Sequence, residues 1–286
     1  GCAPPMPPGS FDNPKGPSHL RRALFRGKKS SCQWGDGKDG VILRLPLCKR
    51  WKRKPWLACA PLYCCDRMKT INLNLLKGAI MAFRLIDIEN WERKEFYQHF
   101  ISQVVCTYSV VVNLDITNLK KHRLYPAMIW LLTKTVNDMP EFRTSLTSEG
   151  LGIYDEMHPM YTVFNKENKN FSGIWSYFSE DYDTFLKDYE VDAEKYGTST
   201  CYAPKDGTPS NSFNISMVPW LEFSGFNINV FDDGHFLLPI FTMGKYFERK
   251  GKRMLPLAIQ VHHAVCDGYH VGLFVEKLQK YIDHFG

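Results

Sequence analysis

The sequence predicts an α/β domain in which helices pack against a sheet of several strands. After about residue 81, stretches with helical spacing alternate with short β-rich runs. The chain ends in a strand, a turn and a helix with a single apolar stripe. A composition of 44% hydrophobic and 14% aromatic residues over 286 positions provides enough apolar surface for a large core.

Residues 1–80 differ in composition from the rest of the chain. They hold 16 of the 36 Lys and Arg residues, 4 of the 30 Asp and Glu, 6 of the 9 cysteines and 9 of the 17 prolines. The remaining chain has 20 basic and 26 acidic residues, so the main body is acidic. We consider a disordered basic tail, a small cysteine-rich module, or upstream sequence joined to the domain. We favour the last and predict a basic Cys- and Pro-rich leader, followed by a domain of residues 81–286 that starts at Met81.

The expected partners and compartment follow from the same division. A nucleic-acid interface would depend on the leader alone, where the basic run 49–54 contains Trp51 and precedes Trp56, so we expect no nucleic-acid partner. The leader has no CxxC pair of the kind that binds zinc. No apolar run of about 18 residues and no secretory signal pattern occurs, so we expect a cytoplasmic protein without membrane contact.

Two helices and six strands are predicted before the last helix. Residues 88–101 have helical spacing, and Tyr125-Pro126 precedes AMIWLLTKTVNDM, where proline suits a first helical turn. The β-rich runs are IYDEM at 153–157, MYTVF at 160–164, FNISMVPW at 213–220, FNINVF at 226–231, LLPIFTMGKYF at 237–247 and LPLAIQVHH at 255–263.

The end of the chain has the clearest pattern. Apolar residues alternate in the last strand, and Asp267-Gly268 interrupts this period before a helix begins. The stripe of the helix consists of Val271, Phe274, Val275, Leu278, Ile282 and Phe285. We therefore expect this helix to pack against the sheet.

The turn HHAVCDG at 262–268 concentrates reactive side chains where the strand ends. A metal site could use His262, His263, Cys266, Asp267 and His270, but adjacent strand residues point to opposite faces and no second ligand cluster follows. We therefore expect no metal. A cysteine between valine and aspartate at a strand end is more often packed inside than used as a nucleophile.

General base catalysis is the third chemistry that this turn allows. An imidazole side chain in general titrates near neutral pH, so that of His263 could remove a proton from an attacking hydroxyl or thiol. Asp267 could cap the last helix, serve as a buried anchor for the turn through an arginine, or do both. A purely structural histidine pair remains an alternative at this point.

The stretch QVHHAVCDGYH resembles the signature of the classical (type A) chloramphenicol acetyltransferases. The resemblance continues, in the order of the family, through NWERKEFY, CTYS, LDIT, YPAMI, EFRT, GIYDEMHP, YTVF, NISMVPW, IFTMGKY and LPLAIQ. It covers the chain from about Met81 to the C-terminus. It implies the coenzyme A-dependent acyltransferase fold of that family, with a two-layer mixed β-sheet and packed helices. HxxxDG alone is shared with dihydrolipoyl acyltransferases.

The resemblance implies a role for five residues in catalysis. His263 corresponds to the base that deprotonates the primary hydroxyl of chloramphenicol for attack on the thioester of acetyl-CoA, across a subunit boundary. Asp267 corresponds to an aspartate paired with an arginine, in the position of Arg93. Ser216 corresponds to a donor to the oxyanion, and Thr242 to a threonine that helps hold a water beside it.

The resemblance also implies substrate contacts, although each of these residues could be ordinary packing. Phe100, Cys106 and Tyr108 match positions lining the chloramphenicol pocket. FNKENKNF at 164–171 departs from the family pattern, so Asn165 and Asn168 are unusual in a strand bordering this pocket. The residues matched to the coenzyme A site are Tyr125, Trp220 and Tyr246.

The implied protein is an antibiotic-resistance enzyme that works as a homotrimer with three interfacial sites. Acetyl-CoA is a co-substrate, and no tightly bound cofactor or metal is implied. Two alternatives remain, namely an acyltransferase of the dihydrolipoyl type and a non-catalytic protein that sequesters the drug.

Overall fold

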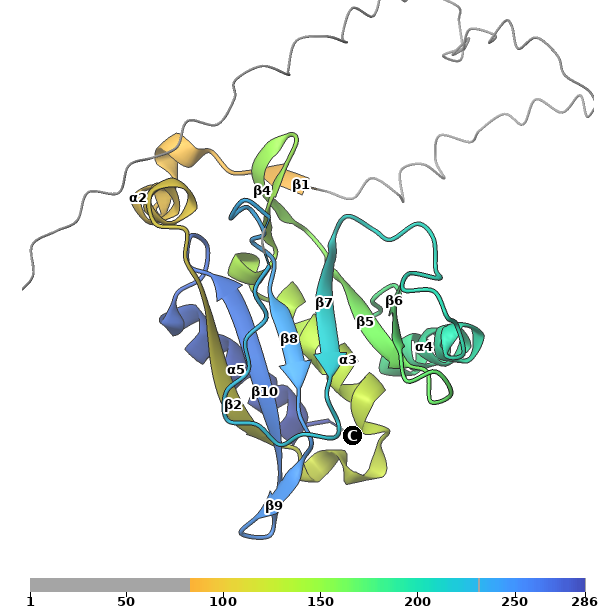
Figure 1. Cartoon of the computed structure of the whole chain (residues 1–286). Coiled ribbons are helices and arrows are strands. Elements are labelled where there is room, and N and C mark those ends of the chain that lie inside the picture. Colours follow the sequence, from red (N-terminus) through yellow and green to blue (C-terminus); the bar gives the residue numbers. More distant parts are fainter. Residues whose placement is uncertain (1–82, 231, 286) are drawn as a thin grey trace, which may run out of the picture. The chain divides into compact units, whose positions relative to one another are not determined.

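A computed structural model of the chain describes residues 83–230 and 232–285. The predicted leader and its boundary at Met81 lie outside the described residues. The described part is an α/β domain with a mixed sheet, as the sequence predicts (Figure 1). Within the described residues, no helix is both long enough and apolar enough to cross a membrane.

The main sheet is seven-stranded and mixed. Its strands run in the order β2 (Thr107–Asp115), β10 (Lys252–His262), β8 (Ile240–Met243), β7 (Ser212–Met217), β5 (His158–Phe164) and β6 (Phe171–Trp175), and β9 (Phe247–Arg249) also pairs with β10. The pairs β5–β7 and β7–β8 are parallel, whereas the other pairs are antiparallel. Strand β10 therefore lies between β2 and β8 and carries the reactive turn at its end.

A second, three-stranded antiparallel sheet lies beside the main one. Its order is β1 (Phe83–Leu85), β4 (Gly150–Tyr154) and β3 (Thr144–Thr147). Gly150 starts β4 with φ +127°, a conformation that favours glycine and allows the tight turn after β3.

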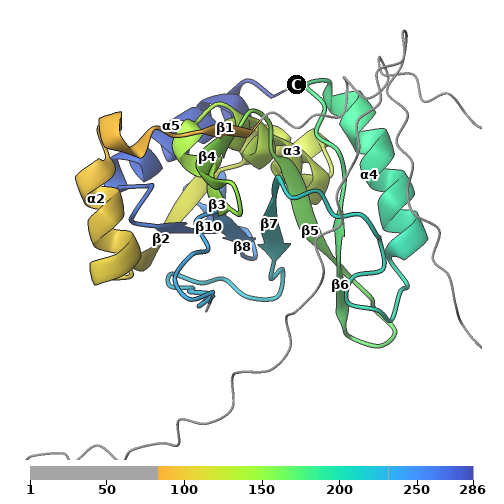
Figure 2. The same ribbon diagram turned by 90° about the horizontal axis from the view of Figure 1, so that it is seen from above.

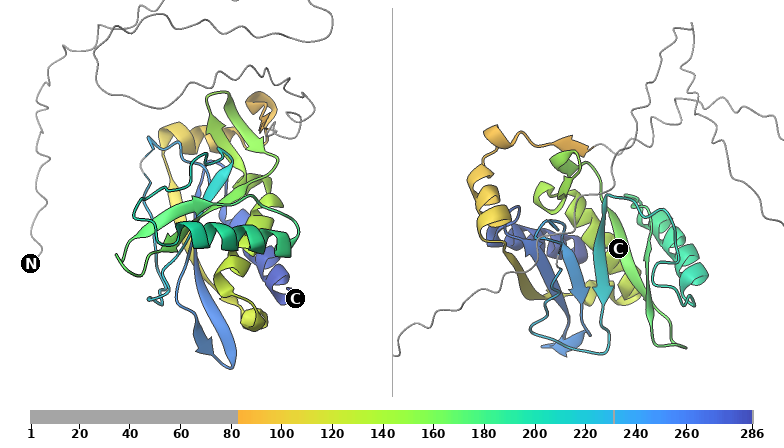
Figure 3. Two further views of the ribbon diagram at one scale, coloured as in Figure 1. Left: turned by 90° about the vertical axis from the view of Figure 1, so that its right-hand side faces the viewer. Right: turned by 45° about the horizontal axis from the view of Figure 1, so that its top comes forward.

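The longer helices form the second layer. Helices α3 (Leu124–Asn137) and α5 (Gly268–Asp283) cover one face of the main sheet (Figure 2), and α4 (Tyr182–Tyr196) packs beside β6. Helix α2 (Lys94–Gln98) lies near β2 at the other end of the sheet (Figure 3) and continues into a π-helical turn, η2 (His99–Gln103). The remaining helical turns are η1 (Ile88–Asn90), η3 (Thr117–Lys121) and η4 (Pro140–Phe142).

The core lies between the main sheet and these helices. The α5 residues Val271, Phe274, Leu278 and Ile282 are buried, while Val275 and Phe285 pack against the core with partial exposure. The predicted stripe of the last helix is therefore confirmed. The prediction for α3 is also confirmed, and Pro126 is its third residue, where a missing N–H breaks no helical bond.

The predicted single helix at 88–101 is wrong. Trp91 has extended backbone with ψ 128°, and this residue separates η1 from α2. Asp87 caps η1 through the N–H of Glu89. The side chain of Arg93, at the start of α2, reaches Asp267 at the other end of the sequence. A tertiary ion pair therefore overrides the local helical pattern.

The predicted strand at 226–231 is wrong for its described residues 226–230. They pair with no strand of the described chain, and the Ile228 N–H donates to the side-chain oxygen of Gln260. Other limits also differ, since IYDEM ends as a strand at Tyr154 and LLPIFTMGKYF contains two strands with Gly244 between them. Strands β1, β2, β3 and β6 and helix α4 were not predicted.

Candidate active site

His263 lies directly after the last residue of β10. Its backbone N–H donates to the Cys106 carbonyl at 2.9 Å, which fixes it to the chain entering β2. Its imidazole stacks on Phe100, with ring centroids 4.1 Å apart and planes 3° apart, and lies edge-on to Tyr108 at 5.3 Å. The side chain is 32% exposed. The ring is therefore oriented by two aromatic neighbours and remains accessible.

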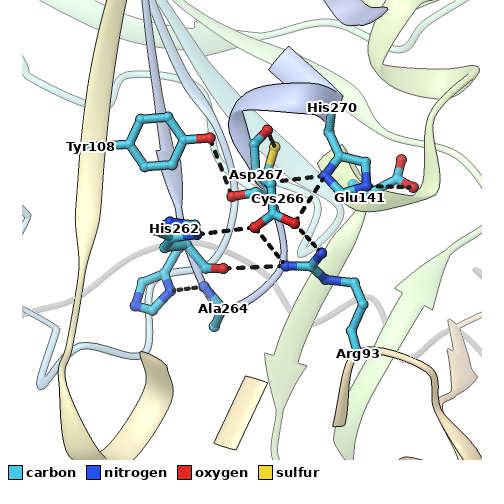
Figure 4. A network of polar contacts seen from close by, with 9 residues as sticks. Arg93, Tyr108, Glu141, His262, Ala264, Cys266, Asp267 and His270 are labelled. Atoms are coloured by element: carbon cyan, nitrogen blue, oxygen red, sulfur yellow. Dashed lines mark hydrogen bonds and ion pairs between the residues drawn. The ribbon is translucent and has the colours of Figure 1, made fainter. Parts of the chain in front are cut away.

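Asp267 and Arg93 hold the turn that carries His263 (Figure 4). Arg93 Nη1 lies 2.5 Å from Asp267 Oδ2 and Nη2 lies 3.1 Å from Oδ1, a two-point ion pair. Nη2 also approaches the His263 carbonyl oxygen at 3.4 Å. The hydrogen bond from Arg93 lowers the pKa of the Asp267 carboxyl below its usual value, so this group stays charged.

Asp267 has both roles that the sequence allowed. It is the N-cap residue of α5, and it is the partner of an arginine. The expected burial is only partly correct, because the side chains of Arg93 and Asp267 are 16% and 29% exposed. The cost of removing one partner is therefore below that of a fully buried pair.

The two adjacent histidines have different surroundings. His262 is 1% exposed, its Nδ1 accepts the Ala264 N–H at 3.1 Å, and burial lowers its pKa. It lines a cavity of about 290 Å³ together with Gln260 and Val230. His262 thus has the surroundings of a neutral, structural imidazole, whereas His263 is open on one side.

The other reactive groups of the turn are not arranged for nucleophilic or metal chemistry. Cys266 is 1% exposed, and burial raises the pKa of its thiol to about 12. This confirms the prediction that the cysteine is packed inside. Within residues 83–230 and 232–285, no three His, Cys, Asp or Glu side chains converge in a way that could hold a metal ion.

Ser216 and Thr242 lie side by side on neighbouring parallel strands. Their hydroxyl oxygens are 2.9 Å apart, and Thr242 is paired in turn with Ala258 of β10. His263 is five residues beyond Ala258, which corresponds to about 16 Å along the strand, and Ser216 is two strands away, about 10 Å across the sheet. The Ser216 and His263 positions of one chain are therefore separated by about 19 Å.

Three of the residues matched to the drug pocket gather around His263. Phe100 stacks on it, the Cys106 carbonyl binds its N–H, and Tyr108 lies at its edge. The Tyr108 hydroxyl also donates to the Cys266 carbonyl at 3.3 Å. This hydroxyl links β2 to the reactive turn, an interaction that the sequence pattern did not indicate.

The two unusual asparagines lie in the turn between β5 and β6. Asn165 is buried, and its side chain donates to the carbonyl oxygens of Thr198 and Ser199. Asn168 is exposed, and its oxygen accepts the Asn170 N–H. Both asparagines thus lie in a turn and not in a strand, where Asn165 ties the turn to the chain after α4 and Asn168 bonds within the turn.

The three residues matched to the coenzyme A site differ in exposure and in their contacts. The Tyr125 hydroxyl donates to the Thr162 carbonyl at 2.9 Å, so this ring is anchored between α3 and β5. Trp220 is 59% exposed and Tyr246 is 40% exposed, and the Arg253 guanidinium lies 4.2 Å from the Tyr246 ring centre. The last two rings are exposed, whereas the Tyr125 ring is held by its hydrogen bond to β5.

Two further residues belong to the same polar network (Figure 4), namely His270, which the sequence suggested only as a possible metal ligand, and Glu141, for which it predicted no role. The Asp267 N–H donates to His270 Nδ1 at 2.9 Å, and His270 Nε2 lies 3.8 Å from a Glu141 oxygen. A polar residue three positions after a helix N-cap is the available sequence signal for such a contact.

Comparisons with known proteins agree over the whole described domain. The family model of chloramphenicol acetyltransferase matches residues 81–279. A chloramphenicol acetyltransferase of Clostridium perfringens is 48% identical over 206 residues, covering 71% of this chain and 100% of the relative. One from Staphylococcus aureus is 45% identical over 209 residues, with coverage of 71% and 100%.

Solved structures share the fold. A chloramphenicol acetyltransferase superimposes with a TM-score of 0.64 at 23% identity, covering 70% of this chain and 100% of that chain. The dihydrolipoamide acetyltransferase of Azotobacter vinelandii gives a TM-score of 0.50 at 16% identity, with coverage of 79% and 98%. The predicted fold class is confirmed, and the match of the family model together with the identity to its members shows that the chain belongs to the chloramphenicol acetyltransferase family.

Proposed function

We propose that the protein transfers the acetyl group of acetyl-CoA to the primary hydroxyl of chloramphenicol and so inactivates the antibiotic. His263 is the general base, and Ser216 stabilises the oxyanion. Phe100, Cys106 and Tyr108 line the acceptor pocket. The reaction uses acetyl-CoA as co-substrate and needs no metal or tightly bound cofactor.

The surroundings of His263 carry this proposal. Its Nδ1 is buried and makes no hydrogen bond, although it lies 3.1 Å from an Asp267 carboxylate oxygen, whereas the side chain as a whole is 32% exposed, so Nε2 is the nitrogen that can reach a substrate hydroxyl. The stack on Phe100 and the bond to Cys106 fix the direction in which this nitrogen points. A base held in this way by rigid elements is ready for proton transfer at little entropic cost.

The chemical steps balance without another reactant. Nε2 of His263 takes the hydroxyl proton while the hydroxyl oxygen bonds to the thioester carbonyl carbon. The carbonyl oxygen becomes an oxyanion that accepts a hydrogen bond from Ser216, whose hydroxyl is oriented by Thr242. The carbon–sulfur bond then breaks, and the sulfur of coenzyme A leaves with the proton from His263. The products are the acetyl ester and the free thiol.

A second copy of the chain is required for this chemistry. His263 and Ser216 must both reach the same tetrahedral intermediate, so their side chains must lie within about 7 Å of each other. In one chain the two positions are about 19 Å apart. His263 of one subunit therefore serves Ser216 of the next. A head-to-tail contact of this kind gives a ring when its rotation closes. We propose a homotrimer with three interfacial sites, acting in the cytoplasm.

The turnover of His263→Ala tests the proposed base. Release of free thiol from acetyl-CoA in the presence of chloramphenicol is expected to fall by about two to four orders of magnitude. His262→Ala serves as the matched control and should lose much less activity. Equal losses in two folded variants would contradict the choice between the histidines.

The choice of acceptor separates this proposal from the two alternatives. Turnover with dihydrolipoamide and little with chloramphenicol would indicate an acyltransferase of the dihydrolipoyl type. Binding of the drug without thiol release would indicate a sequestering protein. The single comparison of the two acceptors with wild-type protein therefore decides among all three.

A further inference from the structure

A second imidazole lies on the other side of the Asp267 carboxylate from His263. His263 Nδ1 is 3.1 Å from Oδ1, whereas His270 Nδ1 is 3.9 Å from Oδ2. His270 also accepts the backbone N–H of Asp267 at 2.9 Å. Arg93 occupies the remaining side of the same carboxylate. The aspartate is thus held through its side chain by Arg93 and through its backbone by His270.

The hydrogen bond to Asp267 defines the state of the His270 ring. Because Nδ1 accepts a hydrogen bond from the Asp267 N–H, the neutral ring carries its own proton on Nε2. This nitrogen faces Glu141, with its Oε1 at 3.8 Å. At this distance no hydrogen bond joins the two groups, and the negative charge of Glu141 favours the ring direction in which the Nε2 proton faces it.

Glu141 is itself placed by a rigid part of the fold. It belongs to η4, and its neighbour Phe142 is 1% exposed and packs on Phe274 of α5 with ring centroids 4.5 Å apart. The carboxylate and the first turn of α5 therefore keep a fixed relation through the core. The His270 ring thus lies between the Asp267 N–H on one side and the Glu141 carboxylate on the other.

We propose that His270, oriented by Glu141, is a positioning residue for the general base. It holds the backbone of Asp267 and thereby fixes the turn of residues 263–267. In this turn the His263 carbonyl and the Asp267 carboxylate both contact Arg93. This proposal rests on the proposed function, in which His263 is the base. Neither His270 nor Glu141 contacts a reacting atom.

The expected consequence of losing this contact is a loss of rate without a loss of binding. In His270→Ala the Asp267 N–H loses its partner, and the turn can shift by a fraction of an ångström. Such misplacement of a reacting group lowers turnover by about 10- to 100-fold. The KM values for both substrates should stay within about twofold, because the pocket residues are unchanged.

Restoration of the hydrogen bond separates positioning from packing. Glutamine at this position reaches back to the N-cap N–H in ordinary capping boxes. His270→Gln should therefore recover most of the turnover. His284→Ala is the matched control, because His284 ends the same helix, bonds to the Lys280 carbonyl and is exposed. It should keep wild-type turnover.

A double-mutant cycle tests the role of Glu141. If Glu141 acts through His270, Glu141→Ala should lower turnover in the wild-type background and add little to His270→Ala. Should His270→Ala fail to fold, His270→Gln and Glu141→Ala still test the proposal, because both variants keep a hydrogen-bond partner for the Asp267 N–H.

Three results would overturn the proposal: a folded His270→Ala with wild-type turnover, a His270→Gln no better than His270→Ala, or full additivity with Glu141→Ala. The proposed function fails in a different way. A folded His263→Ala that retains activity would contradict the base itself, whereas an inactive His263→Ala beside a fully active His270→Ala contradicts only the positioning role.

Discussion

Mixed trimers provide a direct test of the proposal that His263 and Ser216 act from different subunits. The perturbation is to co-express a His263→Ala chain and a Ser216→Ala chain with different affinity tags. Two purification steps then retain only assemblies that contain both chains. Homotrimers of either variant have a defect in every site and should have little activity.

The expected activity of the mixed trimers follows from the register of the sheet. Since the register separates the two groups by about 19 Å in one chain, the proposal has each site take His263 from one subunit and Ser216 from its neighbour. In a ring of three, both possible mixed compositions contain a single interface at which both groups are intact. Mixed trimers should therefore show about a third of the wild-type turnover per trimer.

The assay is chloramphenicol-dependent thiol release from acetyl-CoA, normalised to trimer concentration. Mixed trimers of the His263→Ala chain with a His263→Ala/Ser216→Ala chain are the matched control, and they should stay inactive because no intact His263 is present. Activity of the first mixture near the background of the parent variants would refute the reasoning. That result would place both groups in one chain or remove one of them from the mechanism.

Three further predictions concern single features. Ser216→Ala should lower kcat by about a hundredfold with little change in either KM, and a change confined to the KM for acetyl-CoA would make Ser216 a binding residue instead. Because Arg93 lowers the pKa of Asp267, the pair stabilises the fold above the unfolded aspartate pKa of about 3.9, and this contribution is lost as pH falls through the lower folded pKa. Urea unfolding at fixed protein concentration should thus show a difference of about 1–2 kcal/mol between wild type and Arg93→Met at pH 6 that shrinks towards pH 3, whereas a constant difference would assign the effect to packing. A protein that starts at Met81 should fold, assemble and acetylate chloramphenicol like the full chain, and an insoluble product beside an active full chain would contradict this boundary.

The parts of the fold that the sequence predicted correctly are those in which local pattern and burial agree. The stripe of α5 is periodic because one face of that helix packs on the sheet, whereas the alternation in β10 is one of polarity only, since every residue from Leu255 to His262 is buried. The helical spacing at 88–101 was misleading, since Trp91 is extended and Arg93 is drawn to a distant aspartate. A local sequence pattern carries no information about such a long-range contact.

The site required information about register that lies outside any local pattern. Residues 226–230 have strand composition, but a strand exists only where a neighbour pairs with it, and Gln260 satisfies the Ile228 N–H instead. Similarly, Ser216 and His263 both belong to motifs of the family, but the distance between them depends on the register of β7, β8 and β10. The contact of Glu141 with His270 depends on how η4 packs on α5.

The burial of Cys266 has a consequence for the chemical fidelity of an enzyme that handles a thioester. A thiolate beside the general base could capture the acetyl group by thioester exchange and leave the protein self-acylated. With the thiol pKa at about 12, only about one in 10⁵ of these groups is ionised at neutral pH. The apolar packing that keeps this sulfur protonated therefore leaves the bound alcohol as the acceptor, so that each acetyl group leaves the protein with the product.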